Sequence, residues 1–226
     1  KIDSILKGDY EVSLISSVCG RRHADPMIQH WRIPSVSLTD YKDEMHRIRA
    51  RGDHIQLRTR LMWPVVITIG LLLDGVQRIL TRGVGEGRWS WTLPSAVGAL
   101  LLALRFKPEI ILTTGGPASA HLSGIAVSKL LSIPVVIELQ DPLSGGDIGR
   151  NSQARGWLYR VEKLIVAVAD KTVYVTKGAA AFAASQFQSS KIFCVYPGAR
   201  DFSIIPSPNK SKSSDKFRLV HLGSLY

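Results

Sequence analysis

The chain has 226 residues, of which 45% are hydrophobic and 21% are charged, a balance that is typical of globular proteins and excludes a disordered chain. Lysine and arginine number 29 against 18 acidic residues, so the formal charge is +11 and the surface is expected to attract anions such as nucleic acid, anionic lipid or phosphorylated small molecules. The two cysteines, Cys19 and Cys194, form no CxxC or Cys/His pattern, which argues against a disulfide scaffold or a zinc site and favours a reducing compartment.

The first forty residues predict a single strand. Residues 1–8 are expected to be the tail of a helix that ends at a glycine, and they carry no signal-peptide pattern. Glu11–Ser16 is predicted to be a strand, whereas Val18–Asp40 is expected to be irregular because Pro26 and Pro34 interrupt it. Because the chain starts without methionine and stops within a predicted strand, we expect a fragment of a longer protein.

A basic segment, Asp43–Arg60, precedes an apolar one, Trp63–Leu73, which with 11 residues is too short to span a bilayer, where about 20 are needed. Two interpretations stay open: a solvated protein surface, or a face that contacts an anionic membrane. The candidate membrane-contact residues are Arg47, Arg49, Arg51, Arg58, Arg60 and Trp63. Binding of nucleic acid is not expected, because the basic residues are not interleaved with several aromatic ones and no known module is present.

From Thr92 onward, predicted helices and apolar strands alternate. This pattern predicts an α/β fold, a Rossmann-like parallel sheet with helices on both faces. Residues 1–201 are assigned to this domain, 202–216 to a polar linker and 217–226 to the first strand of a second domain. The predicted elements are a helix at Thr92–Phe106, a strand at Glu109–Thr113, a helix at Ser119–Leu131, a strand at Pro134–Leu139, a helix at Ala154–Ala169, a strand at Lys171–Val175, a helix at Gly178–Phe187 and a strand at Ile192–Tyr196.

Three loops at the predicted carboxyl ends of strands contain polar groups, and ligands bind at that edge of such sheets. A double-glycine turn that opens a helix offers backbone N–H groups to an anion or a hydroxyl, and a histidine in the first turn can move a proton near neutral pH. A carboxylate after the next strand could orient a sugar hydroxyl or act as a general base. The candidates are Gly115, Gly116, Ser119 and His121 in the first loop, Glu138 and Asp141 in the second, and Thr176 and Lys177 in the third.

Each candidate also has a purely structural interpretation. The glycine turn could be a tight connection without a ligand, and His121 could be a hydrogen-bonded core histidine. Asp141 precedes a proline and could cap a turn, and Glu138 could be half-buried in an ion pair with an arginine. No Gly-x-Gly-x-x-Gly fingerprint follows a strand, which argues against a dehydrogenase.

The order of the motifs resembles the amino-terminal domain of family 4 glycosyltransferases, which are retaining enzymes of the GT-B fold. The resemblance extends over roughly residues 9–226. It departs from the family pattern at Pro197-Gly198, where Pro-Asn-Gly is common, and at Gln140-Asp141, where Arg-Asp is common. The matching segments are KPEIIL (107–112), TGGPASAH (114–121), IPVVIELQDP (133–142), ADKTVYVT (169–176), VYPGARDF (195–202) and LGSLY (222–226).

The resemblance implies two Rossmann-like domains that face each other across a cleft, with the acceptor on the amino-terminal domain and a nucleotide sugar on the other. It implies that His121 lies near the transferred sugar, Asp141 on the acceptor side and Gly223 near the donor phosphates. It also implies that the first strand and most of the donor domain lie outside this chain, so that the chain alone is inactive. Neither a cofactor nor a metal is implied.

We therefore expect a glycosyltransferase that moves a sugar from a nucleotide donor to a lipid-linked or polysaccharide acceptor, with retention, in the cytoplasm or at the inner face of the membrane. Two alternatives stay open: a non-catalytic module that binds sugar or acceptor, and a GT-B sugar-nucleotide epimerase that needs no acceptor.

Overall fold

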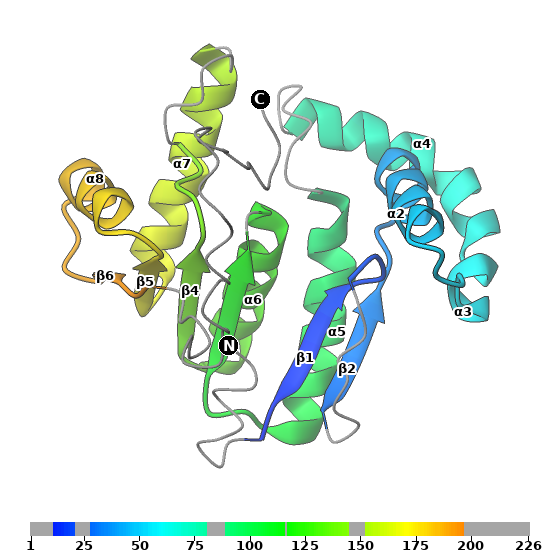
Figure 1. Ribbon diagram of the computed structural model, residues 1–226, viewed down its shortest axis with the longest axis horizontal. Coiled ribbons are helices and arrows are strands. Elements are labelled where there is room, and N and C mark those ends of the chain that lie inside the picture. Colours follow the sequence, from blue (N-terminus) through cyan, green and yellow to red (C-terminus); the bar gives the residue numbers. More distant parts are fainter. Residues whose placement is uncertain (1–10, 21–27, 81–88, 116, 145–151, 197–226) are drawn as a thin grey trace, which may run out of the picture.

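The computed structural model describes residues 11–20, 28–80, 89–115, 117–144 and 152–196, apart from the side chains of residues 58, 77, 80 and 152–154. The central element is a parallel sheet of four strands in the order β3-β4-β5-β6 (Figure 1). The strands are β3 (Ile111–Gly115), β4 (Val135–Leu139), β5 (Lys171–Tyr174) and β6 (Ile192–Cys194). The predicted alternation of strands and helices is therefore confirmed, and each of these strands overlaps the range expected from the sequence.

A second, two-stranded sheet lies beside the first. Its strands, β1 (Ser13–Ser17) and β2 (Gln29–Ile33), are also parallel. Figure 1 shows β1 facing β3, but within the described residues no hydrogen-bonded pairing joins the two sheets. The expectation that Val18–Asp40 is irregular was wrong, because β2 and the start of a helix lie within it. β2 has no run of apolar residues to mark it, and its pairing with β1 defines it as a strand.

The helices agree with the sequence best in the second half of the chain, where α5 to α8 match the predicted ranges within two residues at each end. The apolar segment after Trp63 forms a longer helix than expected, because α4 continues through Asp74-Gly75 to Leu80. The helices are α2 (Leu38–Ala50), α3 (Leu57–Leu61), α4 (Trp63–Leu80), the 3-10 helix η1 (Trp89–Trp91), α5 (Thr92–Phe106), α6 (Ala118–Leu131), α7 (Ser152–Val168) and α8 (Lys177–Phe187). None of the helices in the described residues is long and apolar enough to cross a membrane.

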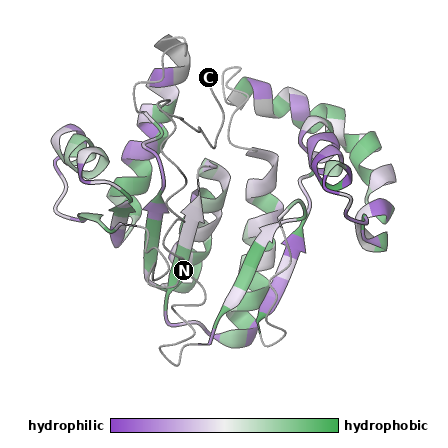
Figure 2. Cartoon of the chain, in the orientation of Figure 1, coloured by the Kyte–Doolittle hydropathy of each residue, from purple (hydrophilic) through white to green (hydrophobic). Residues whose placement is uncertain are grey.

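The main core lies between one face of the four-stranded sheet and the helices α6, α7 and α8. Side chains at alternate strand positions point to this face, and Figure 2 shows hydrophobic residues along the strands and the helices behind them. The core residues are Ala118, Val135, Ile137, Leu139, Leu143, Leu158, Val161, Ile165, Ala169, Tyr174 and Ala183.

On the opposite face of this sheet, the described residues place no helix. Leu112 is 48% exposed there and Phe193 41%. The strands follow one another in sequence order, and right-handed crossovers then put every connecting helix on the same side. The expected second helical layer is thus not seen within the described ranges.

Candidate functional site

The loops that carry the candidate residues leave the sheet at one edge. β3, β4 and β5 are in register, so that Gly115 lies beside Leu139, which in turn lies beside Tyr174. The carboxyl ends of these strands are therefore level with one another, and this edge is where open parallel sheets bind their ligands.

The connection from β3 to α6 is a tight turn. Gly115 has a φ of +131°, a conformation that a residue with a Cβ atom rarely adopts. α6 begins at Ala118, with Pro117 as its N-cap and without a side chain that caps it. The first N–H groups of such a helix lack partners within the helix, and together with the helix dipole they favour an anion or a hydroxyl oxygen. The candidate Gly116 lies outside the described residues.

His121 is fully buried behind this turn rather than exposed at it. Its Nε2 lies 3.2 Å from the carbonyl oxygen of Gly115, and its Nδ1 lies 2.8 Å from Oγ1 of Thr113. A carbonyl oxygen can only accept, so Nε2 carries the proton and donates it to Gly115. Nδ1 is then the acceptor for the Thr113 hydroxyl. The ring therefore fixes the end of β3 relative to the first turns of α6.

Burial also sets the charge of His121. Loss of hydration lowers the pKa of this histidine to about 4, although the bond to Gly115 acts in the opposite direction. The ring is neutral at pH 7, and both of its nitrogens are engaged. This geometry agrees with the structural interpretation of His121, a hydrogen-bonded core histidine. Through its bond to the Gly115 carbonyl, the ring holds the turn at the carboxyl edge of the sheet in place.

Ser119, in the first turn of α6, is a buried polar residue whose side chain is unsatisfied within the described residues. Its side chain is 0% exposed, and within the described part of the chain its Oγ has no hydrogen-bond partner. Ser123, one turn later, differs: its Oγ lies 2.5 Å from Oγ of Ser95, and it lies within hydrogen-bond distance of the carbonyl oxygens of Ser119, at 2.7 Å, and Thr92, at 2.9 Å. Ser123 thus ties α6 to α5, whereas the buried Ser119 hydroxyl has no such partner within the described residues.

The second loop separates the two candidate carboxylates. Glu138 is the fourth residue of β4, is only 5% exposed and lies beside Thr114 of β3. Because strand residues alternate, Glu138 points to the sheet face opposite Ile137 and Leu139. Asp141 lies two residues beyond the strand and is exposed. The loop therefore presents Asp141, and not Glu138, to the solvent at the carboxyl edge.

The third loop contributes less than expected. The Thr176 hydroxyl is the N-cap of α8 and accepts from the Ala179 N–H at 3.2 Å, so it already has a structural partner. Lys177 is exposed and begins α8.

Sequence reasoning missed the buried carboxylate that organises the second loop. Glu162 of α7 is 0% exposed and accepts from both the N–H and the Oγ–H of Ser144, at 2.7 and 2.6 Å. Its other oxygen accepts from the Tyr174 hydroxyl at 2.7 Å. Burial and the Glu162 charge together raise the pKa of Tyr174, so its hydroxyl stays protonated and donates. Glu162 lies in the middle of an amphipathic helix, where an acidic residue gives no signal of such a role.

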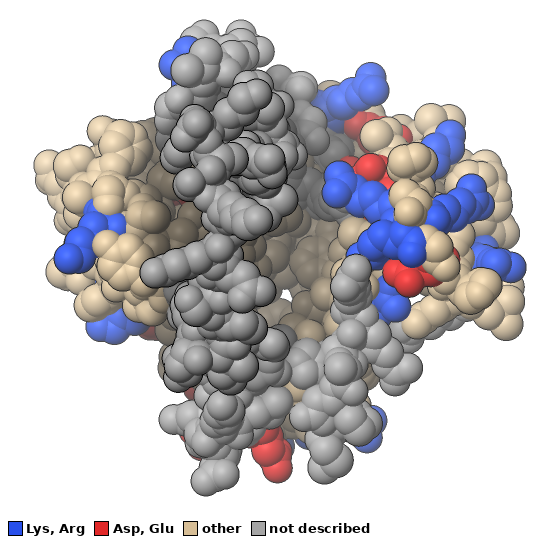
Figure 3. Space-filling view, viewed as in Figure 1, with Lys and Arg blue, Asp and Glu red and all other residues tan. Residues whose placement is uncertain are grey.

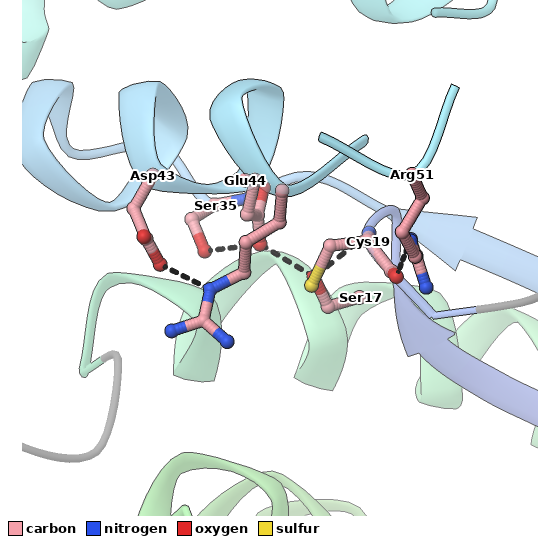
Figure 4. Close-up of polar contacts among 7 residues, drawn as sticks. Ser17, Cys19, Ser35, Asp43, Glu44 and Arg51 are labelled. Atoms are coloured by element: carbon pink, nitrogen blue, oxygen red, sulfur yellow. Dashed lines mark hydrogen bonds and ion pairs between the residues drawn. The ribbon is translucent and has the colours of Figure 1, made fainter. Parts of the chain in front are cut away.

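A similar cluster lies at the carboxyl edge of the smaller sheet (Figure 4). Glu44 of α2 is fully buried and accepts from the Ser35 N–H and Oγ–H, both at 2.9 Å, and from the Ser17 hydroxyl at 2.6 Å. Ser17 Oγ also lies 3.2 Å from the thiol of Cys19, and the Arg51 guanidinium donates to the Cys19 carbonyl. Within the described residues neither Cys19 nor Cys194 forms a disulfide.

The candidate membrane-contact residues lie on α2 and its C-cap and on α3 and α4, but they differ in their surroundings. Arg47 pairs with Asp43 at 3.0 Å and Arg51 with Asp53 at 3.5 Å. Arg49 and Arg60 are exposed. The Trp63 side chain is 40% exposed, and its ring lies 5.9 Å from that of Tyr41. The side chain of Arg58 lies outside the described part of the chain.

Within the described ranges, no group of three or more His, Cys, Asp or Glu residues could hold a metal ion. Gly223, the predicted linker and the predicted second domain lie outside those ranges. Comparison with known proteins identifies no family, since no protein-family model matches the chain. No curated protein matches it either. What the structure establishes is an α/β protein with a four-stranded parallel sheet packed against helices.

Proposed function

We propose that this chain is the acceptor-side domain of a retaining glycosyltransferase that moves a sugar from a nucleotide donor to a lipid-linked or polysaccharide acceptor. The observation that carries the proposal is the start of α6. There, a glycine turn at the carboxyl end of β3 leads into a helix that no side chain caps, and the buried Ser119 hydroxyl lacks a partner within the described residues. The order of motifs that resembles family 4 glycosyltransferases gives the chemistry.

In this proposal the start of α6 binds oxygen atoms of the sugar or of its phosphate. The Ser119 hydroxyl makes one hydrogen bond to the bound molecule, and the first N–H groups of α6 supply others. Asp141 lies exposed at the same edge, where its carboxylate accepts the proton of an acceptor hydroxyl or orients that hydroxyl.

His121 acts through Gly115 and is a positioning residue. Its neutral ring donates to the Gly115 carbonyl at 3.2 Å and so holds the turn that precedes α6. Replacement of His121 by alanine removes this support. A misplacement of reacting groups by about 1 Å can lower turnover roughly a hundredfold, and we expect a loss of that size or more for His121→Ala. His121→Gln keeps an N–H that can reach Gly115 and should restore most of the turnover.

The test uses the complete gene product, including any residues before Lys1 and after Tyr226. The protein is incubated with radiolabelled UDP- and GDP-sugars, with and without a lipid extract as acceptor, and label in the lipid or glycan fraction is measured. Ser119→Ala and Asp141→Asn should each lower transfer at least tenfold, roughly the loss of one or two hydrogen bonds to charged or polar groups. Glu109→Gln changes an exposed carboxylate at the opposite edge of the sheet and should leave transfer unchanged.

The outcome separates the three functions. Acceptor-dependent transfer supports the proposal. Conversion of a nucleotide sugar without any acceptor would show the epimerase, and binding of glycan without turnover would show a binding module. If the Ser119→Ala and Asp141→Asn variants transfer sugar at the same rate as the unchanged protein, the site at the start of α6 does not take part in the transfer.

A further inference from the structure

Helix α4 has two apolar sides, and within the described part of the chain only one of them is covered by other residues. Val66 and Gly70 face α2. Val66 is 1% exposed, and a Cβ added at Gly70 would come within 2.9 Å of the Leu38 backbone nitrogen. Asp74, on the same side, accepts from the Thr39 N–H at 3.2 Å and from the Thr39 hydroxyl at 3.1 Å. This side of α4 is thus closely packed on α2, and it fixes the helix along its length.

The other side of α4 presents a continuous stripe of branched apolar side chains to the solvent. Thr68 lies within this stripe, but its hydroxyl donates to the Pro64 carbonyl at 2.8 Å, so its hydrogen-bonding demand is met inside the helix. The spacing of four and three residues places the stripe on one face of the helix. Its members are Val65, Ile69, Leu72, Val76 and Ile79, with exposed fractions of 48, 42, 70, 43 and 78%.

The short helix α3, which contacts α4, also carries exposed apolar side chains. Leu57 and Leu61 are one turn apart and are 72% and 67% exposed. Leu71 of α4 adds a further exposed side chain at 67%. The exposed apolar surface is thus wider than the narrow seam of a coiled coil, which uses two positions in seven.

Cationic side chains accompany this surface. Arg60 of α3 and Arg78 of α4 are both exposed, and within the described residues neither has an ion-pair partner. The acidic residue of α4, Asp74, is engaged by Thr39. Figure 3 shows lysine and arginine side chains gathered over the part of the molecule that α2, α3 and α4 form.

We propose that α3 and α4 form an anchor that lies in the surface of an anionic lipid bilayer, with the Val65–Ile79 stripe in the acyl region and Arg60 and Arg78 among the headgroups. A second copy of the chain is the other candidate for such a stripe. It is disfavoured because two chains of formal charge +11 repel each other, whereas an anionic bilayer attracts them.

The anchor lies along the membrane surface rather than across it. α4 has 18 residues, which at 1.5 Å per residue gives about 27 Å, slightly less than the hydrocarbon core of a bilayer. One side of the helix is fixed to α2, and Asp74 and Arg78 lie in its last two turns. Helices of this kind insert one face into the boundary between headgroups and acyl chains.

The experiment measures flotation of the complete chain with vesicles of phosphatidylcholine alone and of phosphatidylcholine mixed with phosphatidylglycerol. Leu72→Ser with Ile79→Ser removes the two most exposed members of the stripe. The control, Leu104→Ser with Leu130→Ser, removes two leucines of α5 and α6 that are 57% and 67% exposed. All four side chains are exposed, so both double variants should fold, which circular dichroism verifies.

The unchanged chain and the control should float with the phosphatidylglycerol vesicles and not with phosphatidylcholine alone. The L72S/I79S variant should bind the anionic vesicles at least tenfold more weakly, roughly as expected for two apolar side chains that no longer leave water. Equal binding of both variants would overturn the proposal. It would also be overturned if light scattering showed a dimer that L72S/I79S converts to a monomer, since a second copy would then cover the stripe. Neither outcome depends on whether the protein transfers sugar.

Discussion

A histidine in the first turn of a helix after a glycine turn predicts a group that exchanges protons with a ligand, and the environment of His121 changes that interpretation. Its ring is buried and neutral, with one nitrogen on Thr113 and the other on Gly115. The strand-to-helix transition at this loop could be predicted from the sequence because its glycines and the elements on either side of it are local features. The sequence could not show burial of the side chain, which depends on how α6 packs on β3.

The burial of His121 predicts a pH dependence of stability. The pKa of the buried ring is about 4, against 6.5 in an unfolded chain. Between these two pH values the unfolded state binds a proton that the folded state does not. The contribution of His121 to the free energy of unfolding is therefore complete above pH 6.5 and is lost as the pH falls toward 4. Between pH 7 and pH 4.5 the free energy of unfolding should decrease by about 2 kcal/mol on this account.

Urea unfolding of the unchanged chain and of His121→Gln at both pH values measures this effect. Glutamine does not titrate, so the free energy of unfolding of the variant should decrease less between the two pH values, by about 2 kcal/mol. The other titrating groups are the same in both proteins, and their effects cancel in the comparison. The same decrease in both proteins would mean that His121 does not titrate with the predicted pKa.

Two buried glutamates share one role, although they lie on different helices. Glu44 accepts from the N–H and hydroxyl of Ser35 in the loop after β2, and Glu162 does the same for Ser144 in the loop after β4. In each case a carboxylate from a helix holds the chain just where it leaves a parallel strand. The lone acidic residue of α7 could not be recognised in this role from the sequence, because its partners are brought to it only by the fold.

Glu162→Gln should therefore destabilise the fold. Glutamine offers one oxygen where the carboxylate serves three donors, so at least one buried donor loses its partner, at a cost of about 1–3 kcal/mol. Chemical unfolding would measure this loss, with the exposed Glu109→Gln as the matched control for the loss of a charge. An unchanged midpoint for Glu162→Gln would show that water replaces the carboxylate at no cost.

At the scale of the elements, the sequence predicts well the helices and strands whose own residues favour that structure. The strands β3 to β6 are short segments rich in β-branched and aromatic residues, and the helices between them follow directly. β2 and α2 were missed because β2 is polar and becomes a strand by pairing with β1. One signal for α2 was present: Ser37 and Asp40 have the spacing of a helix start, and the Ser37 hydroxyl does accept from the Asp40 N–H at 3.2 Å.

The close contact of α6 with β3 depends on a glycine in the helix. A Cβ atom at Gly124 would lie 2.3 Å from Cγ2 of Thr113, whose hydroxyl is held by His121 and whose side chain is branched at Cβ. Gly124→Ala should therefore push α6 off the strand and lower the free energy of unfolding by about 1–3 kcal/mol.

Gly156 of α7 gives the matched control, since it is exposed and a Cβ there would meet no atom within 4 Å. Gly156→Ala should stabilise the fold by up to about 1 kcal/mol, because alanine has less freedom to lose in a helix. Thermal unfolding of the two variants should thus shift in opposite directions. A shift of the same sign and size would show that the contact between Gly124 and Thr113 does not limit the packing.

At the scale of the whole molecule, the two sheets differ in what they present to their surroundings. The four-stranded sheet buries one face against α6, α7 and α8 and directs its loops to one edge, where the proposed sugar site lies. The smaller sheet leads into α2, α3 and α4, which bring arginines and exposed apolar side chains together. Composition and charge predict an affinity for anions. They cannot show which surface binds the anions, because that depends on which arginines the fold places beside acidic residues.

The arginines should accordingly contribute unequally to membrane binding. Arg47 and Arg51 lie next to Asp43 and Asp53, which offset their charge, whereas Arg60 and Arg78 are exposed on the proposed anchor itself. A basic residue near an anionic bilayer contributes about 1 kcal/mol, so Arg60→Gln with Arg78→Gln should weaken binding to phosphatidylglycerol vesicles roughly thirtyfold. Arg47→Gln with Arg51→Gln removes the same formal charge from α2 and its C-cap and should weaken binding by much less. Equal losses for the two pairs, measured by flotation at low salt, would mean that the net charge of the chain attracts the bilayer, without a contribution from the position of α3 and α4.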